Sequence, residues 1–397
     1  MSNEITKEPE IRFDGYEGDW EERKVGEVFS ERSERSGEGE LISVTINSGV
    51  VKASELDRKD NSSDDKSNYK KVEVGDIAYN SMRMWQGASG YSPYNGILSP
   101  AYTVIIPKKD IDSKFFAYDF KRYDMIQTFK RNSQGLTSDT WNLKFPTLKS
   151  VKVMVPSIEE QKQISTFFES LDTTITLHQR ELDLLEQTKQ TYLKKMFPKT
   201  GEDKPEIRFA GFTDAWEQRK LGDYVIDYVE KTTVQNQFPV LTSSQQRGIV
   251  FQEDYFANRQ VTTDNNVGYF VLPRGYFTYR SRSDNNIFVF NRNDIVDKGI
   301  ISYFYPVFTL KSANPDFFLK RINNGIQRQL SIQAEGTGQH VLSLKKFKNI
   351  IAKFPNEKEQ AQIGNFFKHL DNAIALHQRE LDSLKEMKKT LLQKMFV

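Results

Sequence analysis

The chain has 397 residues, enough for two or three domains, and its formal net charge of +2 neither favours nor excludes nucleic acid as a ligand. It has no cysteine, which excludes disulfides and cysteine metal sites, and its four histidines are too few and too scattered for a histidine-rich metal site. The N-terminus lacks the apolar core of a signal peptide, and no run approaches the roughly 20 apolar residues of a membrane helix, so we expect a cytoplasmic protein without membrane contact.

A short head opens the first half of the chain, from Pro9 to Phe29, and contains Trp20. We expect this tryptophan to pack the head against a domain or a helix rather than to stack on a base. The next stretch, residues 30–156, alternates apolar runs with turn residues, which predicts strands and one helix. The expected strands are Leu41–Thr45, Asp76–Asn80, Ala101–Ile106 and Val151–Val155, and the expected helix is Ser113–Phe129.

Residues 157–197 predict one long helix. Ser157 and Glu160 have the spacing of a capping box, in which two side chains satisfy free N–H groups of the first turn, and Pro198 would end the helix. Apolar residues recur at alternating intervals of four and three, as in a coiled coil. The stripe comprises Ile164, Phe168, Leu171, Ile175, His178, Leu182, Leu185, Lys189, Tyr192 and Met196. Asp172 lies beside the stripe, and we expect it to face solvent or a partner.

The second half of the chain repeats this order. Residues 356–396 match residues 157–197 at 23 of 41 positions, and Asp371 corresponds to Asp172. A second head, residues 205–225, matches the first at 11 of 21 positions, with Trp216 in place of Trp20. Between head and helix we expect strands at Val240–Thr242, Tyr276–Tyr279, Ile287–Phe290, Phe304–Leu310 and Ile350–Phe354, and a helix at Pro315–Ile332.

Two similar stripes in one chain most simply pack on each other. Since the first helix leads directly into the second domain, the second helix must return along it. The sequence therefore predicts an α+β fold in which two mixed α/β domains are separated by two long antiparallel coiled-coil helices, with a pseudo-two-fold internal repeat. The expected boundaries are 1–156 for head and first domain, 157–198 for the first helix, 199–355 for linker, head and second domain, and 356–397 for the second helix.

The two variable stretches share their glycine positions but differ in most other residues, as a protein that reads two different ligands would. Their loops are rich in arginine, which pairs with guanine, and in asparagine and glutamine, which pair with adenine. Seven basic residues against two acidic ones between Lys121 and Lys152 also predict a positive patch for phosphates. The candidate DNA-binding residues of the first half are Asn80, Ser81, Arg83, Trp85, Gln86, Lys130, Arg131, Asn132, Gln134, Thr137 and Ser138. Those of the second half are Arg280, Ser281, Arg282, Asn285, Asn286, Arg328, Gln333, Thr337, Gln339 and His340.

Sequence motifs of enzymes are absent. The chain contains no phosphate-binding loop, no dinucleotide-binding glycine pattern and no nucleophile elbow, and without a Pro-Pro dipeptide it cannot carry the usual motif of amino-methyltransferases. We therefore expect no catalytic residues, no metal and no cofactor in this chain.

The long helices carry Glu160-Gln161-Lys162-Gln163-Ile164 with Leu171-Asp172-Thr173-Thr174-Ile175, and Glu359-Gln360-Ala361-Gln362-Ile363 with Leu370-Asp371-Asn372-Ala373-Ile374. These motifs, on a variable domain followed by a long helix and repeated over nearly the whole chain, resemble the specificity subunit of type I restriction–modification systems. Residues 75–103 also resemble a target-recognition domain of that family.

The resemblance implies two target-recognition domains that read a bipartite DNA site, two half-sites with an unread gap. It also implies assembly on double-stranded DNA with two methyltransferase subunits and with restriction–translocase subunits. S-adenosylmethionine, ATP and magnesium would belong to those partners. Two alternatives remain open at this stage: a coiled-coil DNA-binding adaptor or regulator outside restriction–modification, and a single-chain modification enzyme, which the missing methyltransferase motif disfavours.

Overall fold

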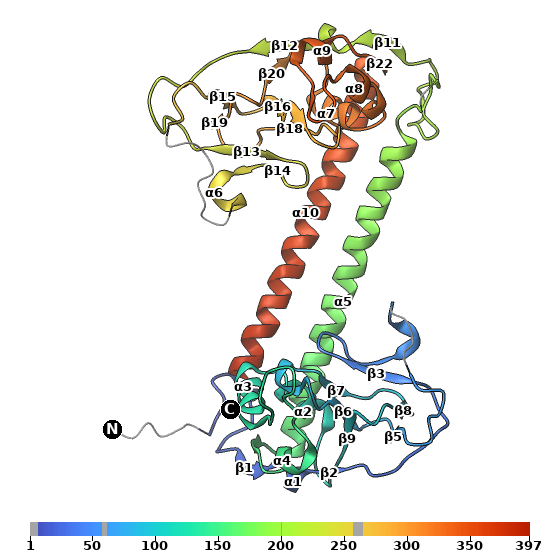
Figure 1. The fold of residues 1–397 in the computed structure, drawn as a ribbon, viewed down its shortest axis with the longest axis vertical. Coiled ribbons are helices and arrows are strands. Elements are labelled where there is room, and N and C mark those ends of the chain that lie inside the picture. The colour runs from blue at the N-terminus through green and yellow to red at the C-terminus, as the bar shows by residue number, and fades with distance from the viewer. Residues whose placement is uncertain (1–6, 58–61, 200, 257–264) are drawn as a thin grey trace. The chain divides into compact units, whose positions relative to one another are not determined.

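The computed structural model describes residues 7–57, 62–199, 201–256 and 265–397. Contacts divide the chain into two compact units: unit 1 comprises Met1–Gln179 and Arg379–Val397, and unit 2 comprises Arg180–Gln378. Each unit thus contains one mixed α/β domain and parts of both long helices (Figure 1). Within the described ranges, no helix is both long enough and apolar enough to cross a bilayer.

Unit 1 is built around a four-stranded antiparallel sheet in the order β2-β9-β6-β7, accompanied by the pairs β1–β10, β3–β4 and β5–β8. Its main core packs aromatic side chains of α2 and α3 against this sheet, with Phe29 and Phe116 in edge-to-face contact at 5.2 Å. The strands are β1 Glu21–Lys24, β2 Phe29–Glu31, β3 Ile42–Thr45, β4 Gly49–Lys52, β5 Lys70–Val72, β6 Ile77–Asn80, β7 Ser89–Tyr91, β8 Gly96–Leu98, β9 Tyr102–Pro107 and β10 Lys152–Val155. The helices are α1 Val25–Val28, α2 Ser113–Asp119, α3 Tyr123–Asn132 and α4 Phe145–Leu148, with short 3-10 turns η1 Ala53–Glu55 and η2 Met84–Gln86.

Unit 2 has the same strand order. Its four-stranded sheet runs β12-β20-β16-β18, and the pairs β11–β22, β13–β14 and β15–β19 match those of unit 1, with β17–β21 in addition. The strands are β11 Glu217–Lys220, β12 Val225–Tyr228, β13 Leu241–Ser244, β14 Gly248–Phe251, β15 Phe270–Pro273, β16 Phe277–Tyr279, β17 Arg282–Ser283, β18 Phe290–Arg292, β19 Lys298–Ile301, β20 Val307–Leu310, β21 His340–Val341 and β22 Ile351–Phe354. The helices are α6 Gln252–Tyr255, α7 Pro315–Asn323, α8 Gln327–Gln333 and α9 Leu344–Lys348, with the 3-10 turn η3 Leu221–Asp223. The matching topology confirms that one fold occurs twice.

Both predicted domain helices are broken in two. The expected helix 113–129 ends at Asp119 and resumes at Tyr123, because the backbone of Arg122 is extended, with φ −64° and ψ 148°; its side chain turns inward to bond Asp119 at 2.7 Å. The expected helix 315–332 breaks at Gly325, whose φ of +81° is the left-handed conformation that ends helices. Two expected strands are also displaced: β18 begins only at Phe290, and β20 only at Val307.

The two long helices are α5, Ile158–Lys195, and α10, Glu357–Lys394, each of 38 residues. Within each unit they pair antiparallel, as expected. In unit 1 the rings of Phe168 and Phe396 lie 5.9 Å apart, and Lys388 reaches Asp172 at 2.5 Å. In unit 2 the corresponding partners are Phe367 with Phe197 at 6.0 Å and Asp371 with Lys189 at 2.8 Å.

These ion pairs add to one expectation. Asp172 was expected to face solvent or a partner; its side chain is 39% exposed, and it also accepts hydrogen bonds from Lys388 and from the Tyr118 hydroxyl at 2.9 Å. Asp371 likewise accepts from Lys320 at 2.5 Å besides its pair with Lys189. Burial by itself would raise the pKa of Asp371, but the two lysines outweigh it and hold that pKa below its ordinary range. The Leu-Asp-x-x-Ile motif therefore ties the two helices to each other and to the domain.

The Glu-Gln pair at the start of each long helix anchors it to head and domain. In unit 1 the Ser157 hydroxyl accepts the expected bond from the backbone N–H of Glu160 at 3.2 Å. The Glu160 carboxylate, expected to complete a capping box, instead accepts two bonds from the Arg12 guanidinium at 2.8 and 2.9 Å. Gln161 accepts from the backbone of Asp112, the N-cap of α2, at 2.9 Å. The same contacts recur in unit 2 among Asn356, Glu359, Arg208, Gln360 and Asn314.

The repeated Lys-Met-Phe at the end of each long helix closes a hydrophobic core. Phe396 packs in the core of unit 1 against Trp20 and Phe115, with ring centroids at 6.3 and 5.0 Å. Phe197 packs in unit 2 against Trp216 at 6.2 Å. Both tryptophans are almost fully buried, which confirms that they are packing anchors for the heads and not base-stacking residues.

Candidate nucleic-acid interface

The turn that follows β6 carries the first candidate cluster of unit 1. Arg83 is exposed, and its guanidinium lies 3.4 Å from the amide oxygen of Gln86. The Asn80 side chain accepts a hydrogen bond from the backbone of the turn at 3.0 Å. Ser81 was expected to reach DNA but does not point outward, since it is 5% exposed and bonds the Thr103 hydroxyl at 2.8 Å. Its role is to hold the turn on β9.

The second cluster of unit 1 lies at the surface after α3. All six of its members are exposed: Lys130, Arg131, Asn132, Gln134, Thr137 and Ser138. A loop of residues 134–142, the tip loop, is closed at its base by two backbone hydrogen bonds between Gln134 and Asn142, at 3.0 and 2.8 Å.

The two clusters, far apart in sequence, meet through aromatic side chains. Trp85 of the first packs edge-to-face on Trp141 of the tip loop at 5.2 Å, and the Lys130 ammonium lies over the Trp141 ring at 5.7 Å. The Trp85 indole donates to the Met82 carbonyl at 3.0 Å, so this side chain stabilises the surface rather than offering a free donor. Together the clusters form one surface that combines cations, amides and hydroxyl groups.

Of the seven basic residues in the positive patch predicted between residues 121 and 152, five are exposed, namely Lys130, Arg131, Lys144, Lys149 and Lys152, whereas Lys121 and Arg122 turn inward. Arg122 is buried against Asp119, and Lys152 pairs with Glu22 at 2.7 Å. Lys121 turns inward, donating to the carbonyl of Ile46 at 2.9 Å and to that of Gly87; burial, with repulsion from Lys388, lowers the pKa of Lys121 to about 8. The prediction assumed that residues close in sequence share one surface. The break after α2 instead turns Lys121 and Arg122 inward and leaves Lys130 and Arg131 exposed.

In unit 2 the turn after β16 carries the corresponding residues. Arg280 and Arg282 are exposed, and between them Ser281 donates to the Phe304 carbonyl at 2.6 Å. The Arg282 guanidinium lies 4.2 Å above the Phe304 ring, a cation–π contact that fixes the direction of its donors. Asn285 is exposed, whereas Asn286 is half-buried with a φ of +57°.

This turn forms one wall of a cavity of about 580 Å³. Arg280, Arg282 and Asn285 line it from one side, and residues 243–246, which form the end of β13 and the start of the turn after it, line it from the other. The second wall was missed by the sequence analysis. The sequence feature that could have indicated this wall is a polar run, Ser243-Ser244-Gln245-Gln246, enclosed by two short strands. Amide side chains such as those of Gln245 and Gln246 can form hydrogen bonds with base edges.

The remaining candidates of unit 2 follow α8. Arg328 is exposed on that helix, and Thr337 and Gln339 are exposed in the loop after it. Pairing of β17 with β21 places His340 opposite Ser283, and the Gln339 amide lies 3.4 Å from Asp284. The two clusters of unit 2 therefore also meet, whereas Gln333 is half-buried at the end of α8.

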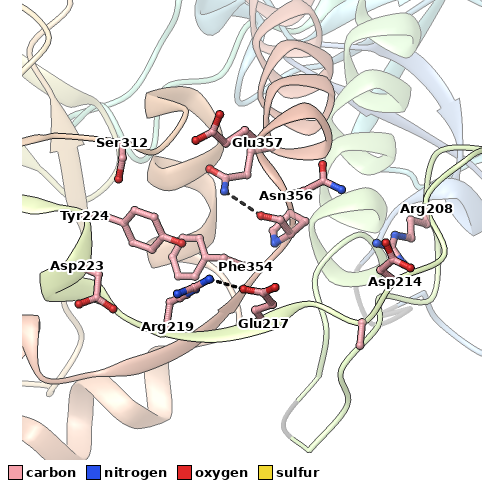
Figure 2. Close-up of a pocket in the computed structure, with 13 residues that line it drawn as sticks. Arg208, Asp214, Glu217, Arg219, Asp223, Tyr224, Ser312, Phe354, Asn356 and Glu357 are labelled. Atoms are coloured by element: carbon pink, nitrogen blue, oxygen red, sulfur yellow. Dashed lines mark hydrogen bonds and ion pairs between the residues drawn. The ribbon is translucent and has the colours of Figure 1, made fainter.

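A second cavity of unit 2, of about 510 Å³, lies at the start of α10 and contains none of the candidates (Figure 2). Four carboxylates against two guanidiniums line it: Asp214, Glu217, Asp223 and Glu357 against Arg208 and Arg219. An excess of carboxylates disfavours phosphate, so nucleic acid fits the cleft beside Arg282 better than this cavity.

Comparison with known proteins agrees with the duplicated fold. The family described as the type I restriction modification DNA specificity domain matches residues 17–187 and again 213–386. The type I restriction enzyme MjaVIII specificity subunit of Methanocaldococcus jannaschii is 21% identical over 345 residues, which cover 78% of this chain and 76% of that protein. The MjaIX specificity subunit of the same organism is 32% identical over 128 residues, 30% of this chain and 28% of its own length.

The fold also has a solved counterpart. The crystal structure of the type I restriction–modification S subunit from M. genitalium superimposes with a TM-score of 0.57 at 14% identity, covering 98% of this chain and 99% of the other. Because the family matches both halves of the chain, in register with the structural repeat, the chain belongs to the type I restriction–modification DNA specificity family, and its function is the recognition of a DNA sequence.

Proposed function

We propose that this chain reads a bipartite DNA target, one half-site with each of its two recognition domains, residues 1–156 and 199–355. The observation that carries this proposal is the repeat: the same strand order presents two sets of loops that share almost no side chains. A scaffold used twice with different loops reads two different half-sites, separated by base pairs that neither domain contacts. The candidate DNA-binding residues of the exposed loops remain a prediction.

The chain itself is proposed to be non-catalytic and to direct partners to its target, namely methyltransferase and restriction subunits acting on the DNA in the cytoplasm. Each half-repeat is proposed to bind one methyltransferase copy on the outer face of its long helix. In support, α5 exposes Leu177 at 57% and α10 exposes the equivalent Leu376 at 49%, off the stripe that packs inward. Arg180 and Arg379, three residues after each leucine, are exposed as well, whereas Glu181 and Glu380 lie 3.7 and 3.8 Å from His377 and His178 of the opposite helix.

Stoichiometry tests the partner proposal. The mass of the complex purified with saturating methyltransferase should correspond to two copies per chain. Leu177→Asp or Leu376→Asp alone should reduce this to one copy, whereas Lys389→Asp, also exposed on α10, should leave two. One copy per wild-type chain would contradict the proposal.

Methylome sequencing of cells that carry the complex tests the reading of two half-sites. The methylated motif should consist of two short specific sequences with a gap. Replacing residues 30–156 with the corresponding stretch of another specificity subunit should change one of these sequences and preserve the other. A change in both half-sites would refute the assignment of one half-site to each domain.

A further inference from the structure

The tip loop of unit 1 is a constrained structure. Besides the two bonds at its base, the Thr140 backbone N–H and hydroxyl both donate to the Thr137 carbonyl at 2.9 Å. Gly135 has a φ of +153°, and a β-carbon there would lie 2.6 Å from the Thr140 carbonyl oxygen, so only glycine fits. The backbone at the tip is therefore constrained before any ligand binds, which lowers the entropic cost of binding.

One aliphatic side chain lies at this tip. Leu136 is completely exposed, with a relative accessibility of 101%, and its neighbours Thr137, Ser138 and Asp139 are exposed and polar. Packing inside the protein does not require a leucine at such a position. The side chain sits on a turn whose other end, at Trp141, carries the ammonium of Lys130 above its ring.

We propose that Leu136 reads the C5-methyl group of a thymine in the half-site of unit 1. This inference rests on the proposed function, because it requires the tip loop to enter the major groove. There the thymine methyl is the one apolar group on a base edge, and an aliphatic side chain distinguishes it from the polar edges of other bases. The cations Lys130 and Arg131 at the end of α3 are exposed and supply contacts for the flanking phosphates.

The equivalent loop of unit 2 has the same closed base as the tip loop of unit 1 but a different tip. Glu335 and Val341 close it with two backbone bonds at 3.0 and 2.8 Å, as Gln134 and Asn142 do in unit 1. Its tip, however, reads Gly336-Thr337-Gly338-Gln339 and contains no aliphatic side chain. The proposed methyl contact therefore belongs to unit 1 alone.

The experiment measures the affinity of the complex with its methyltransferase partners for duplexes that carry its own methylated motif, at one fixed salt concentration. Each thymine of both half-sites is replaced in turn by deoxyuridine, which removes only the methyl group. One replacement, in the unit 1 half-site, should weaken binding about fourfold, the effect expected for one buried methyl group. In the Leu136→Ala variant the same replacement should have no further effect, whereas Val74→Ala, which shortens another exposed aliphatic side chain of unit 1, should retain the fourfold effect.

Several results would overturn the inference. A unit 1 half-site without any A·T pair, a wild-type complex indifferent to every deoxyuridine, or a deoxyuridine effect that survives in Leu136→Ala would each do so. A uniform loss of affinity on all duplexes in Leu136→Ala would instead indicate an apolar wedge between bases, and would also refute the methyl contact. In all these cases the complex still recognises its motif; a complex that prefers no sequence at all would refute the proposed function itself.

Discussion

The last residues of the chain should stabilise the first domain, and Phe396→Ala tests this directly. The phenylalanine is 4% exposed, at the end of the chain, but its ring lies inside the core of unit 1. It contacts the rings of Phe115, Phe168 and Trp20 at 5.0, 5.9 and 6.3 Å, and the Arg122 guanidinium lies 5.4 Å above it. Substitution removes all four contacts at once.

The expected loss follows from these contacts. Replacing a buried phenylalanine by alanine costs about 3–5 kcal/mol, of which each aromatic pair contributes roughly 0.5–1.5 kcal/mol beyond its buried area. For Phe396→Ala we expect the lower end of this range, about 3 kcal/mol. A typical domain is stable by only about 5–15 kcal/mol, so unit 1 should lose a large part of its stability.

Hydrogen exchange followed by mass spectrometry locates this effect. Amides of unit 1 that exchange through global opening, such as those of β6 and β9, should exchange roughly 150-fold faster, the equivalent of about 3 kcal/mol. Amides of β16 and β20 in unit 2 should keep their wild-type rates. Phe197→Ala, the matched variant, should produce the reverse pattern. Faster exchange in unit 2 on substitution of Phe396, or no change in unit 1, would refute the reasoning.

Three further outcomes are expected. Arg282→Ala should reduce discrimination at one base pair of the unit 2 half-site by about 1–3 kcal/mol, if its oriented guanidinium pairs with guanine, and should leave the unit 1 half-site unchanged as an internal control in a methylome. Asp371→Asn should lower the melting temperature above about pH 4, where the carboxylate paired with Lys320 is ionised. Since the pKa of Asp371 in the folded protein is held below its ordinary value of 3.8, this advantage of the wild type should decline as the pH falls further. A difference in melting temperature that is unchanged at pH 3 would count against this reasoning. Lys121→Met should remove a pH dependence of stability. Burial, and secondarily Lys388, lowers the pKa of Lys121 from 10.5 to about 8 in the folded protein, so between pH 8 and 10.5 the unfolded chain binds more protons than the folded chain. Only the wild type should therefore gain stability as the pH rises through this range, as paired thermal melts would show.

Local sequence determined the repeat and much of the secondary structure. Strands β3, β6, β9, β10 and β22 and both long helices lie within one or two residues of their predicted bounds, because alternating and 4-3 apolar periods are properties of neighbouring residues. The packing roles of Trp20 and Trp216 could be predicted for the same reason, since each recurs at the same place in a repeated head. The helix break at Gly325 was missed although Asn324-Gly325 is a recognisable stop signal.

The candidate interface was predicted less completely. Exposed positions such as Arg83, Arg282 and Thr137 lie where a loop residue is expected, and whether they contact DNA stays a prediction. The buried orientation of Ser81 could not be read from the chain, because it depends on a hydroxyl 22 residues away in β9. The wall of the unit 2 cleft formed by Ser243–Gln246 depends in the same way on how two distant turns approach each other.

The sequence by itself determined the family, the duplicated architecture and the positions of the helices, since these follow from periods and motifs within short windows. Only the tertiary structure decided what the repeated motifs do. Glu160 binds Arg12 across 148 residues of chain, Asp172 binds Lys388 across 216, and Phe396 completes the core of the N-terminal unit. The sequence does not show which partner a carboxylate or an aromatic ring will contact, because such contacts form only when folding brings distant segments together.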